Sequence, residues 1–305
     1  MIYTCTLNPS IDYKIEANEL HIGMLNRPEK TAFYPGGKGI NVSLVLKNLD
    51  IQNIALGFVG GFTGDFLKDC LKKKGVLFDF IEHNEPTRIN VKIKTNLEET
   101  EINGNGAYIS KEAEDEFLLK MNSLTKHDYL IISGSIPSSV SNNIYEEIAK
   151  ICMKKEVPFI VDISDSSLLD LLKYRPFLIK PNQYELGELL GIEINSKEEV
   201  IKAGKELVES GAENVIVSMG GNGAIFINHE MRAYAKVPKG DVRSSVGAGD
   251  STVAGFLASY LNNRDVMEAF RYGVASGTAT AFSMDLCKKD EVENIFPQVE
   301  IEILQ

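Results

Sequence analysis

The sequence has no tryptophan and only four cysteines and four histidines among 305 residues. The cysteines lie far apart with no C-x-x-C pair, which argues against a disulfide framework and predicts reduced, mostly buried thiols. The histidines are equally scattered and show no metal-ligand spacing, so we expect no histidine metal site. Together these absences favour a cytoplasmic protein.

Long apolar runs and basic runs are also missing. No apolar stretch is long enough to span a membrane, and the first residues are typical of a strand rather than of a signal peptide. The net charge is −11 and the pI is near 5.0, without the basic patch that nucleic-acid binding needs. We therefore expect neither a membrane nor a nucleic acid as partner. A phosphorylated ligand is still compatible, since a few local Lys and Arg residues dominate at short range.

What the sequence does contain is enough apolar material for one large core, with 44% hydrophobic residues. From residue 110 onward, short apolar runs alternate with segments of helical periodicity. The runs cover 128–133, 158–162, 177–180, 214–219 and 223–228, followed by 231–237 as an expected outer strand. This alternation predicts a mostly parallel sheet covered by helices on both faces.

Two polar segments, 13–32 and 87–103, do not fit that pattern. The second alternates on both sides of a polar turn at 96–98 and is typical of a β-hairpin. With extended pieces of the first segment it predicts a small β-sheet lid over a core formed by 1–12, 33–86 and 104–305. Such a sheet leaves one face that needs a cover, either the ligand or a second subunit.

Two glycine-rich turns run directly into helices and are the strongest functional signals. One is Gly36-Gly37-Lys38-Gly39, which places a cation among exposed backbone donors, with Asn41 one turn later. The other is Gly247-Ala248-Gly249-Asp250. Backbone N–H groups in such a turn can converge on an anion at the positive end of a helix. A bland alternative for Asp250 is an ordinary helix cap.

Further polar residues follow the ends of predicted strands, where α/β proteins keep their ligands. Asp12 follows the first strand and is either a contact for sugar hydroxyls or a turn residue. Ser135 lies in a small-residue turn after 128–133. The segment Lys180-Pro181-Asn182 opens a helix in which Glu185 is either functional or a first-turn acidic residue.

Four loops at the ends of predicted strands, 36–41, 133–135, 180–185 and 247–250, resemble in that order the ribokinase-like (PfkB) family of carbohydrate kinases. The resemblance extends from Asn8 to about Phe282. The resemblance implies a three-layer α/β/α fold with a mostly parallel central sheet and a small β-sheet lid. It also implies phosphoryl transfer from ATP with Mg²⁺. Asn8 to Asp12, Thr87 to Lys92 and Thr278 to Phe282 are most similar to the branch that phosphorylates fructose 1-phosphate at its 6-hydroxyl.

The family's residue roles can be carried over one by one. The resemblance implies Asp250 as the base and Gly247, Ala248 and Gly249 as the anion hole. It implies Asp12, Gly37, Asn41 and Ser135 as sugar contacts, with Lys38, Arg88 and Asn90 holding the phosphate that the sugar already carries. It implies Lys180 at the nucleotide phosphates and Asn182 with Glu185 at Mg²⁺, largely through water. The nucleotide site would be lined by Ser218, Gly220, Gly223, Gly277 and Ala281.

Several alternatives stay open at this point. A tagatose-6-phosphate kinase or a 6-phosphofructokinase of the same family would share many of these residues. Lys38 and Arg88 argue against an unphosphorylated sugar, because two cations suit a phosphate. Asp250 argues against a non-catalytic binding module, which needs no base. The expected partners are a sugar phosphate and ATP, with a possible homodimer through the lid.

Overall fold

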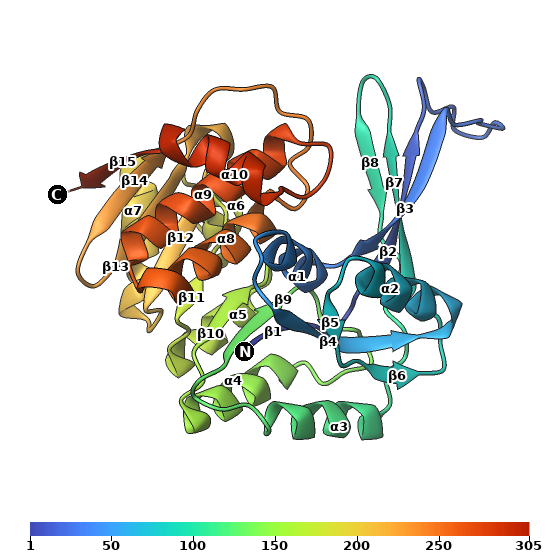
Figure 1. The fold of residues 1–305 in the computed structure, drawn as a ribbon, viewed down its shortest axis with the longest axis horizontal. Coiled ribbons are helices and arrows are strands. Elements are labelled where there is room, and N and C mark those ends of the chain that lie inside the picture. Colours follow the sequence, from blue (N-terminus) through green and yellow to red (C-terminus); the bar gives the residue numbers. More distant parts are fainter. Residues whose placement is uncertain (305) are drawn as a thin grey trace.

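An 11-stranded sheet forms the centre of the computed structural model, which describes residues 1–304 (Figure 1). Its strand order is β15-β14-β13-β12-β11-β10-β9-β1-β4-β5, and β6 also pairs with β4. The parallel part comprises β1 (Ile2–Thr6), β4 (Asn53–Gly60), β5 (Leu77–Phe78), β6 (Ile81–His83), β9 (Tyr129–Ser133), β10 (Phe159–Asp162), β11 (Leu178–Ile179) and β12 (Asn214–Ser218). The antiparallel end comprises β13 (Ala224–Asn228), β14 (Arg232–Lys236) and β15 (Glu300–Leu304).

Helices cover both faces of this sheet, as the continuous apolar strands predict. One face packs against α1 (Lys38–Asn48), α2 (Gly61–Lys73), α8 (Ala248–Asn263), α9 (Val266–Phe282) and α10 (Lys289–Ile295). The other packs against α3 (Lys111–Met121), α4 (Ile144–Lys155), α5 (Ser167–Leu171), α6 (Gln183–Leu190) and α7 (Lys197–Glu209). In β9, for example, Leu130 and Ile132 contribute to one core and Ile131 to the other. The expected three-layer, ribokinase-like arrangement is confirmed.

A separate four-stranded sheet, the lid, projects from one end of the core (Figure 1). Its order is β3 (Lys30–Gly36), β2 (Ser10–Glu16), β7 (Arg88–Lys94) and β8 (Glu99–Ile102). Strands β2 and β7 are parallel, and the other two pairings are antiparallel. The lid strands extend beyond the expected segments 13–32 and 87–103, since β2 begins at Ser10 and β3 continues to Gly36.

The two faces of the lid differ in character. Strand alternation places Asp12, Asn90 and Lys92 on one face, and both Asn90 and Lys92 are buried. The opposite face carries apolar side chains, of which Phe33 and Ile102 are 52% and 58% exposed. The polar face therefore has buried side chains at its centre, whereas part of the apolar face is exposed.

One local expectation, that of 231–237 as an outer strand, needs revision. Strand β14 is not at the sheet edge, because the C-terminal β15 pairs with it. The alternating glutamates of β15 suit an edge position that must resist further pairing.

The structure also shows the state of the cysteines and the character of the helices. All four cysteines are unpaired, and three of them are buried. No helix among residues 1–304 is long and apolar enough to cross a membrane.

Candidate active site

Asp250 lies where the two glycine-rich turns meet. Gly247 precedes α8 with a φ of +79°, a conformation that glycine adopts without strain, and this turns the chain so that Asp250 falls in the first helical turn. The Asp250 side chain is buried, with 6% exposure. Asn41, from the first turn of α1, donates a hydrogen bond from Nδ2 to Asp250 Oδ2 at 2.8 Å. The two loops are thus joined through the expected base.

The surroundings of Asp250 tune its proton affinity. Burial, and secondly the negative charge of Asp162, raise the pKa of Asp250 to about 6. The Asn41 hydrogen bond and the charges of Lys38 and Lys180 act in the opposite direction. At neutral pH the carboxyl group is ionised, yet it is a stronger proton acceptor than an exposed aspartate. That is the property expected of a general base.

The loop before Asp250 faces a lysine. A Cβ atom placed on Gly249 would lie 2.9 Å from the ammonium nitrogen of Lys180. Lys180 follows β11 directly and is buried. The N–H groups of the first turn of α8 have no partners within the helix, so they and the Lys180 ammonium can both meet an anion at Gly249.

Asp162 is a site residue that sequence reasoning missed. It ends β10 and is 2% exposed, and its Oδ1 lies 3.6 Å from Lys180 Nζ and 3.4 Å from Lys38 Nζ. Burial alone would raise the pKa of Asp162, but the charges of Lys180 and Lys38 bring it below the ordinary value. Within residues 1–304, its Oδ2 has no hydrogen-bond partner. Its position at the end of a buried strand was the one signal available.

Lys38 and Arg88, expected together at the sugar phosphate, share no contact in the described structure. Lys38 Nζ donates to Ser164 Oγ at 3.0 Å and approaches Asp162 and, at 4.0 Å, Glu185. Arg88 instead donates to the carbonyl oxygens of Asn8 and Gly104. Lys38 thus belongs to the group of charges around Lys180, whereas Arg88 lies at the base of the lid.

The expected sugar contacts lie along the lid and α1. Asp12 Oδ1 accepts hydrogen bonds from Ser10 Oγ at 2.9 Å and from Asn90 Nδ2 at 3.0 Å. Gly37 precedes α1 with a φ of +111°. Ser135 accepts a hydrogen bond from Asn8 Nδ2 at 3.2 Å and lies apart from this network.

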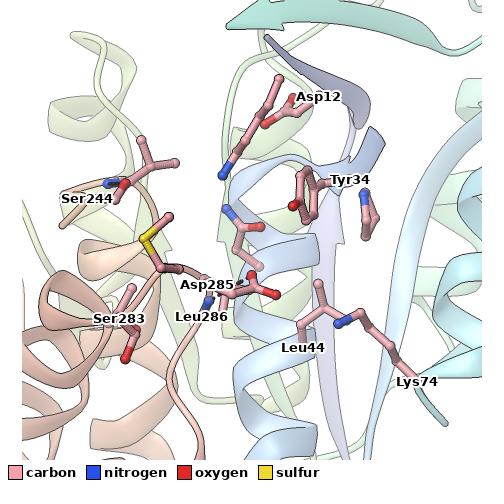
Figure 2. Close-up of a pocket in the computed structure, with 14 residues that line it drawn as sticks. Asp12, Tyr34, Leu44, Lys74, Ser244, Ser283, Asp285 and Leu286 are labelled. Carbon is pink, nitrogen blue, oxygen red and sulfur yellow. Dashed lines mark hydrogen bonds between the residues drawn. The ribbon is translucent and has the colours of Figure 1, made fainter. Parts of the chain in front are cut away.

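A pocket adjoins these residues. It encloses about 570 Å³, part of which is open to solvent, and Asp12 and Asn41 are among its lining residues. Figure 2 shows Asp12 and Tyr34 on one side of this pocket, across from Ser244 and Ser283. The space between the lid and the C-terminal part of the core is therefore accessible to a small polar ligand.

Asn182 and Glu185 form a reciprocal helix cap at the start of α6. Asn182 Oδ1 accepts from the N–H groups of Tyr184 and Glu185, and Glu185 Oε2 accepts from the N–H of Asn182. The other Glu185 oxygen, Oε1, accepts from Ser164 Oγ at 2.7 Å. The local cap explains much of the geometry of this pair.

The same region can be tested for a magnesium ion. No group of three or more His, Cys, Asp or Glu side chains in residues 1–304 is placed to hold a metal. Mg²⁺, however, keeps most of its waters and often uses only one or two carboxylates besides phosphate oxygens. The unpartnered Oδ2 of Asp162 and the neighbouring Glu185 fit a water-mediated site of that kind.

The expected nucleotide residues divide into two groups. Ser218 ends β12 beside Asn182, and Gly220 and Gly223 form the following turn with positive φ. Gly277 lies in the contact between α9 and α8, where a Cβ atom would overlap Thr252 Oγ1. The Ala281 carbonyl accepts from the N–H groups of Arg243 and Ser244, which fixes the loop before the anion hole. For Gly277 the contact that requires glycine is helix packing.

Comparison with known proteins identifies the family of this chain. Residues 6–291 match the model of the pfkB family carbohydrate kinases, and the chain belongs to that family. The resemblance noted from the sequence is thereby confirmed.

Individual relatives are similar over their full length. The chain is 49% identical to the 1-phosphofructokinase of Bacillus subtilis, over 99% of each chain. It is 37% identical to the D-tagatose-1-phosphate kinase of Bacillus licheniformis, again over 99% of each. The structure of phosphofructokinase-2 from Escherichia coli in complex with substrates and products has a TM-score of 0.91 at 30% identity, covering 97% of this chain and 98% of that one.

Proposed function

We propose that the protein is an ATP-dependent 1-phosphofructokinase, which phosphorylates D-fructose 1-phosphate at the 6-hydroxyl to give fructose 1,6-bisphosphate. The observation that carries this proposal is the buried Asp250 at the start of α8, joined to Asn41 and preceded by the Gly247–Gly249 turn. The name of the Bacillus subtilis relative supports the choice of substrate.

The reaction needs one base and compensation for developing charge. Asp250 accepts the proton of the 6-hydroxyl while that oxygen forms a bond to the γ-phosphorus and the bond to the ADP oxygen breaks. The N–H groups at Gly247, Ala248 and Gly249, together with Lys180, stabilise the transferring phosphoryl group. When bound, Mg²⁺ would neutralise phosphate charge, with Glu185 and Asp162 holding it through water and Asn182 capping the helix beside it.

The sugar is proposed to lie between the lid and α1. Asp12, Asn90, Gly37 and Asn41 are the proposed contacts for its hydroxyls, with Ser135 at the edge. Arg88 is proposed to hold its phosphate by charge-assisted hydrogen bonds. The contacts of Lys38 with Asp162 and Glu185 favour a place for Lys38 nearer the transferring phosphoryl group. Ser218, Gly220, Gly223 and Ala281 are proposed to border the nucleotide.

The test of this assignment is a comparison of kcat/KM for several phosphosugars on one preparation. We expect fructose 1-phosphate to exceed tagatose 1-phosphate, fructose 6-phosphate and tagatose 6-phosphate. Tagatose 1-phosphate is included because of the 37% identical relative named for it, and fructose 6-phosphate because of the phosphofructokinase-2 structures. A preference for any other sugar would overturn the substrate while leaving the kinase reaction intact.

A homodimer through the lid is part of the proposal. The apolar lid face carries Phe33 stacked on Tyr13 at 4.4 Å between ring centroids, and about half of Phe33 is exposed in the single chain. Exposed apolar surface of this kind is a usual site of association. We also propose a cytoplasmic location, in keeping with four unpaired cysteines and the use of ATP.

A further inference from the structure

Lys92 is a buried cation that has no role in the reaction proposed above. It lies in β7, and only 9% of the residue is exposed. Its ammonium nitrogen is 3.5 Å from Asp12 Oδ2 and 3.2 Å from Glu101 Oε1. A buried lysine is costly unless it is paired, so its two carboxylate neighbours account for its stability but not for its presence at this place.

The position of Lys92 is set by the pairing of the lid strands. Lys92 lies opposite Glu101 in β8, and its strand neighbour β2 carries Asp12 on the same face. The three charged groups therefore cross three adjacent strands on the polar face of the lid. Asp12 Oδ1 is already held by Ser10 and Asn90, so Lys92 restrains the second oxygen of the same carboxylate.

We propose that Lys92 is a positioning and specificity-determining residue, which orients Asp12 and neutralises the lid so that it can accept a sugar that already carries a phosphate. This inference rests on the proposed function only in requiring a phosphosugar as substrate. Lys92 acts through Asp12 and needs no direct contact with the reacting atoms.

The charge balance of the lid is the physical basis. Lys14 lies opposite Lys92 in β2, but its ammonium is placed over the Tyr34 ring, and Lys92 is the cation paired with Asp12 and Glu101. Without Lys92 these two unpaired carboxylates would face a sugar phosphate that carries nearly two more negative charges. Like charges in a partly desolvated site repel one another several-fold more strongly than in water. Burial would lower the pKa of Lys92, but Asp12 and Glu101 outweigh that effect and raise it, so the ammonium is charged throughout the working pH range.

A matched control lies on the same strand. Lys94 has the same side-chain direction in β7, but it is exposed and donates only a weak contact to the carbonyl oxygen of Arg243 at 3.4 Å. Removing the charge at Lys94 changes the net charge of the lid by the same amount without unpairing Asp12. A difference between the two lysines therefore reports position and not total charge.

The experiment compares Lys92→Met with Lys94→Met by steady-state kinetics on the phosphosugar that the unmodified enzyme uses best. We expect Lys92→Met to raise KM for that sugar at least about tenfold, with kcat and KM for ATP changed by less than about threefold. The increase should shrink at high salt, because the unpaired carboxylates are then screened. Lys94→Met should leave KM for the sugar within about twofold.

A second pair of variants keeps the inference testable if Lys92→Met folds poorly. Lys92→Arg should retain KM within about threefold, and Glu101→Gln should leave or lower KM for the phosphosugar, since it removes a negative charge. Unchanged KM in Lys92→Met, an equal rise in KM for ATP, or a higher sugar KM in Glu101→Gln would each overturn the role of Lys92.

The outcomes separate this inference from the proposed function. If another phosphosugar is preferred over fructose 1-phosphate, the substrate assignment fails and the lysine comparison continues with the preferred sugar. If no phosphosugar is turned over, the kinase assignment fails, and calorimetric titration of fructose 1-phosphate into the same variants replaces KM. A Lys92→Met protein that binds the sugar phosphate as tightly as the unmodified chain would then overturn the inference.

Discussion

The two sheets of this protein distribute polarity in opposite ways. The inner strands of the central sheet, such as β9 and β10, are buried and apolar on both faces, and charged residues gather where such strands end, as with Asp162 and Lys180. The lid buries Lys92 on its polar face and leaves Phe33 and Ile102 of its apolar face exposed. The first arrangement anchors the proposed reacting groups in a core. In the second, the proposed sugar contacts lie on a small sheet whose other face is partly exposed.

The largest expected effect comes from removing the carboxylate of Asp250, the proposed base. Asp250→Asn should lower kcat by at least about 100-fold, because the hydroxyl proton loses its acceptor. KM for ATP should change little, since the substitution is isosteric. Steady-state kinetics would show this, with Glu268→Gln in the exposed first turn of α9 as control. A kcat close to that of the unmodified enzyme would remove Asp250 from the mechanism.

The same substitution should stabilise the fold. The pKa of Asp250 is raised to about 6 in the folded state, so ionised Asp250 costs stability above that pH, and the cost fades as the pH falls towards 4. Asp250→Asn should therefore increase the free energy of unfolding by roughly 2–3 kcal/mol at pH 8 and much less at pH 4. Denaturant titration at both pH values measures this, and an equal effect at both would contradict the pKa argument.

The pH dependence of kcat/KM tests the role of Asp250 without a mutation. Because protonated Asp250 cannot act as a base, kcat/KM should fall about tenfold per pH unit below a pH of about 6. The profile should be recorded with saturating Mg²⁺. The sugar phosphate itself titrates near this pH, so kcat/KM should be calculated from the concentration of its dianionic form at each pH. A flat profile down to pH 5 would show that Asp250 has an ordinary pKa or no part in proton transfer.

The smallest expected effect is a change of oligomeric state caused by a substitution in the lid. Phe33→Asp places a charge on the exposed apolar face, remote from the polar face that carries Asp12. If the lid pairs with a second subunit, the mass measured by light scattering should fall from a dimer to a monomer. Lys30→Asp, also in β3 but on the polar side, is the matched control. An unmodified chain that is already monomeric would refute the lid dimer.

The central sheet was predictable because its strands are continuous apolar runs between helical segments. Lys180, which follows β11 directly, lies against Gly249 of the second glycine turn, so two of the loops singled out from the sequence lie side by side in the structure. Asp162 was missed because an aspartate at a strand end has no distinguishing local pattern. Its partner Lys38 is 124 residues away, and such long-range pairing is not encoded in spacing.

Small residues gave the most ambiguous signal. The Ala- and Gly-rich segment of α9 is compatible with either a ligand or a neighbouring helix. The space around Gly277 decides for the helix, because Thr252 and Ala248 occupy the position that a side chain would need. Residue type alone cannot distinguish these cases, since both require the absence of a Cβ atom.

That contact also limits how this chain can vary over generations. A methyl group at Gly277 would lie 2.9 Å from the carbonyl oxygen of Ala248, the middle residue of the Gly247–Gly249 turn. Even an alanine there would displace the turn on which phosphoryl transfer is proposed to depend. A substitution at Gly277 in α9 could thus abolish activity although every residue proposed to contact a substrate is unchanged.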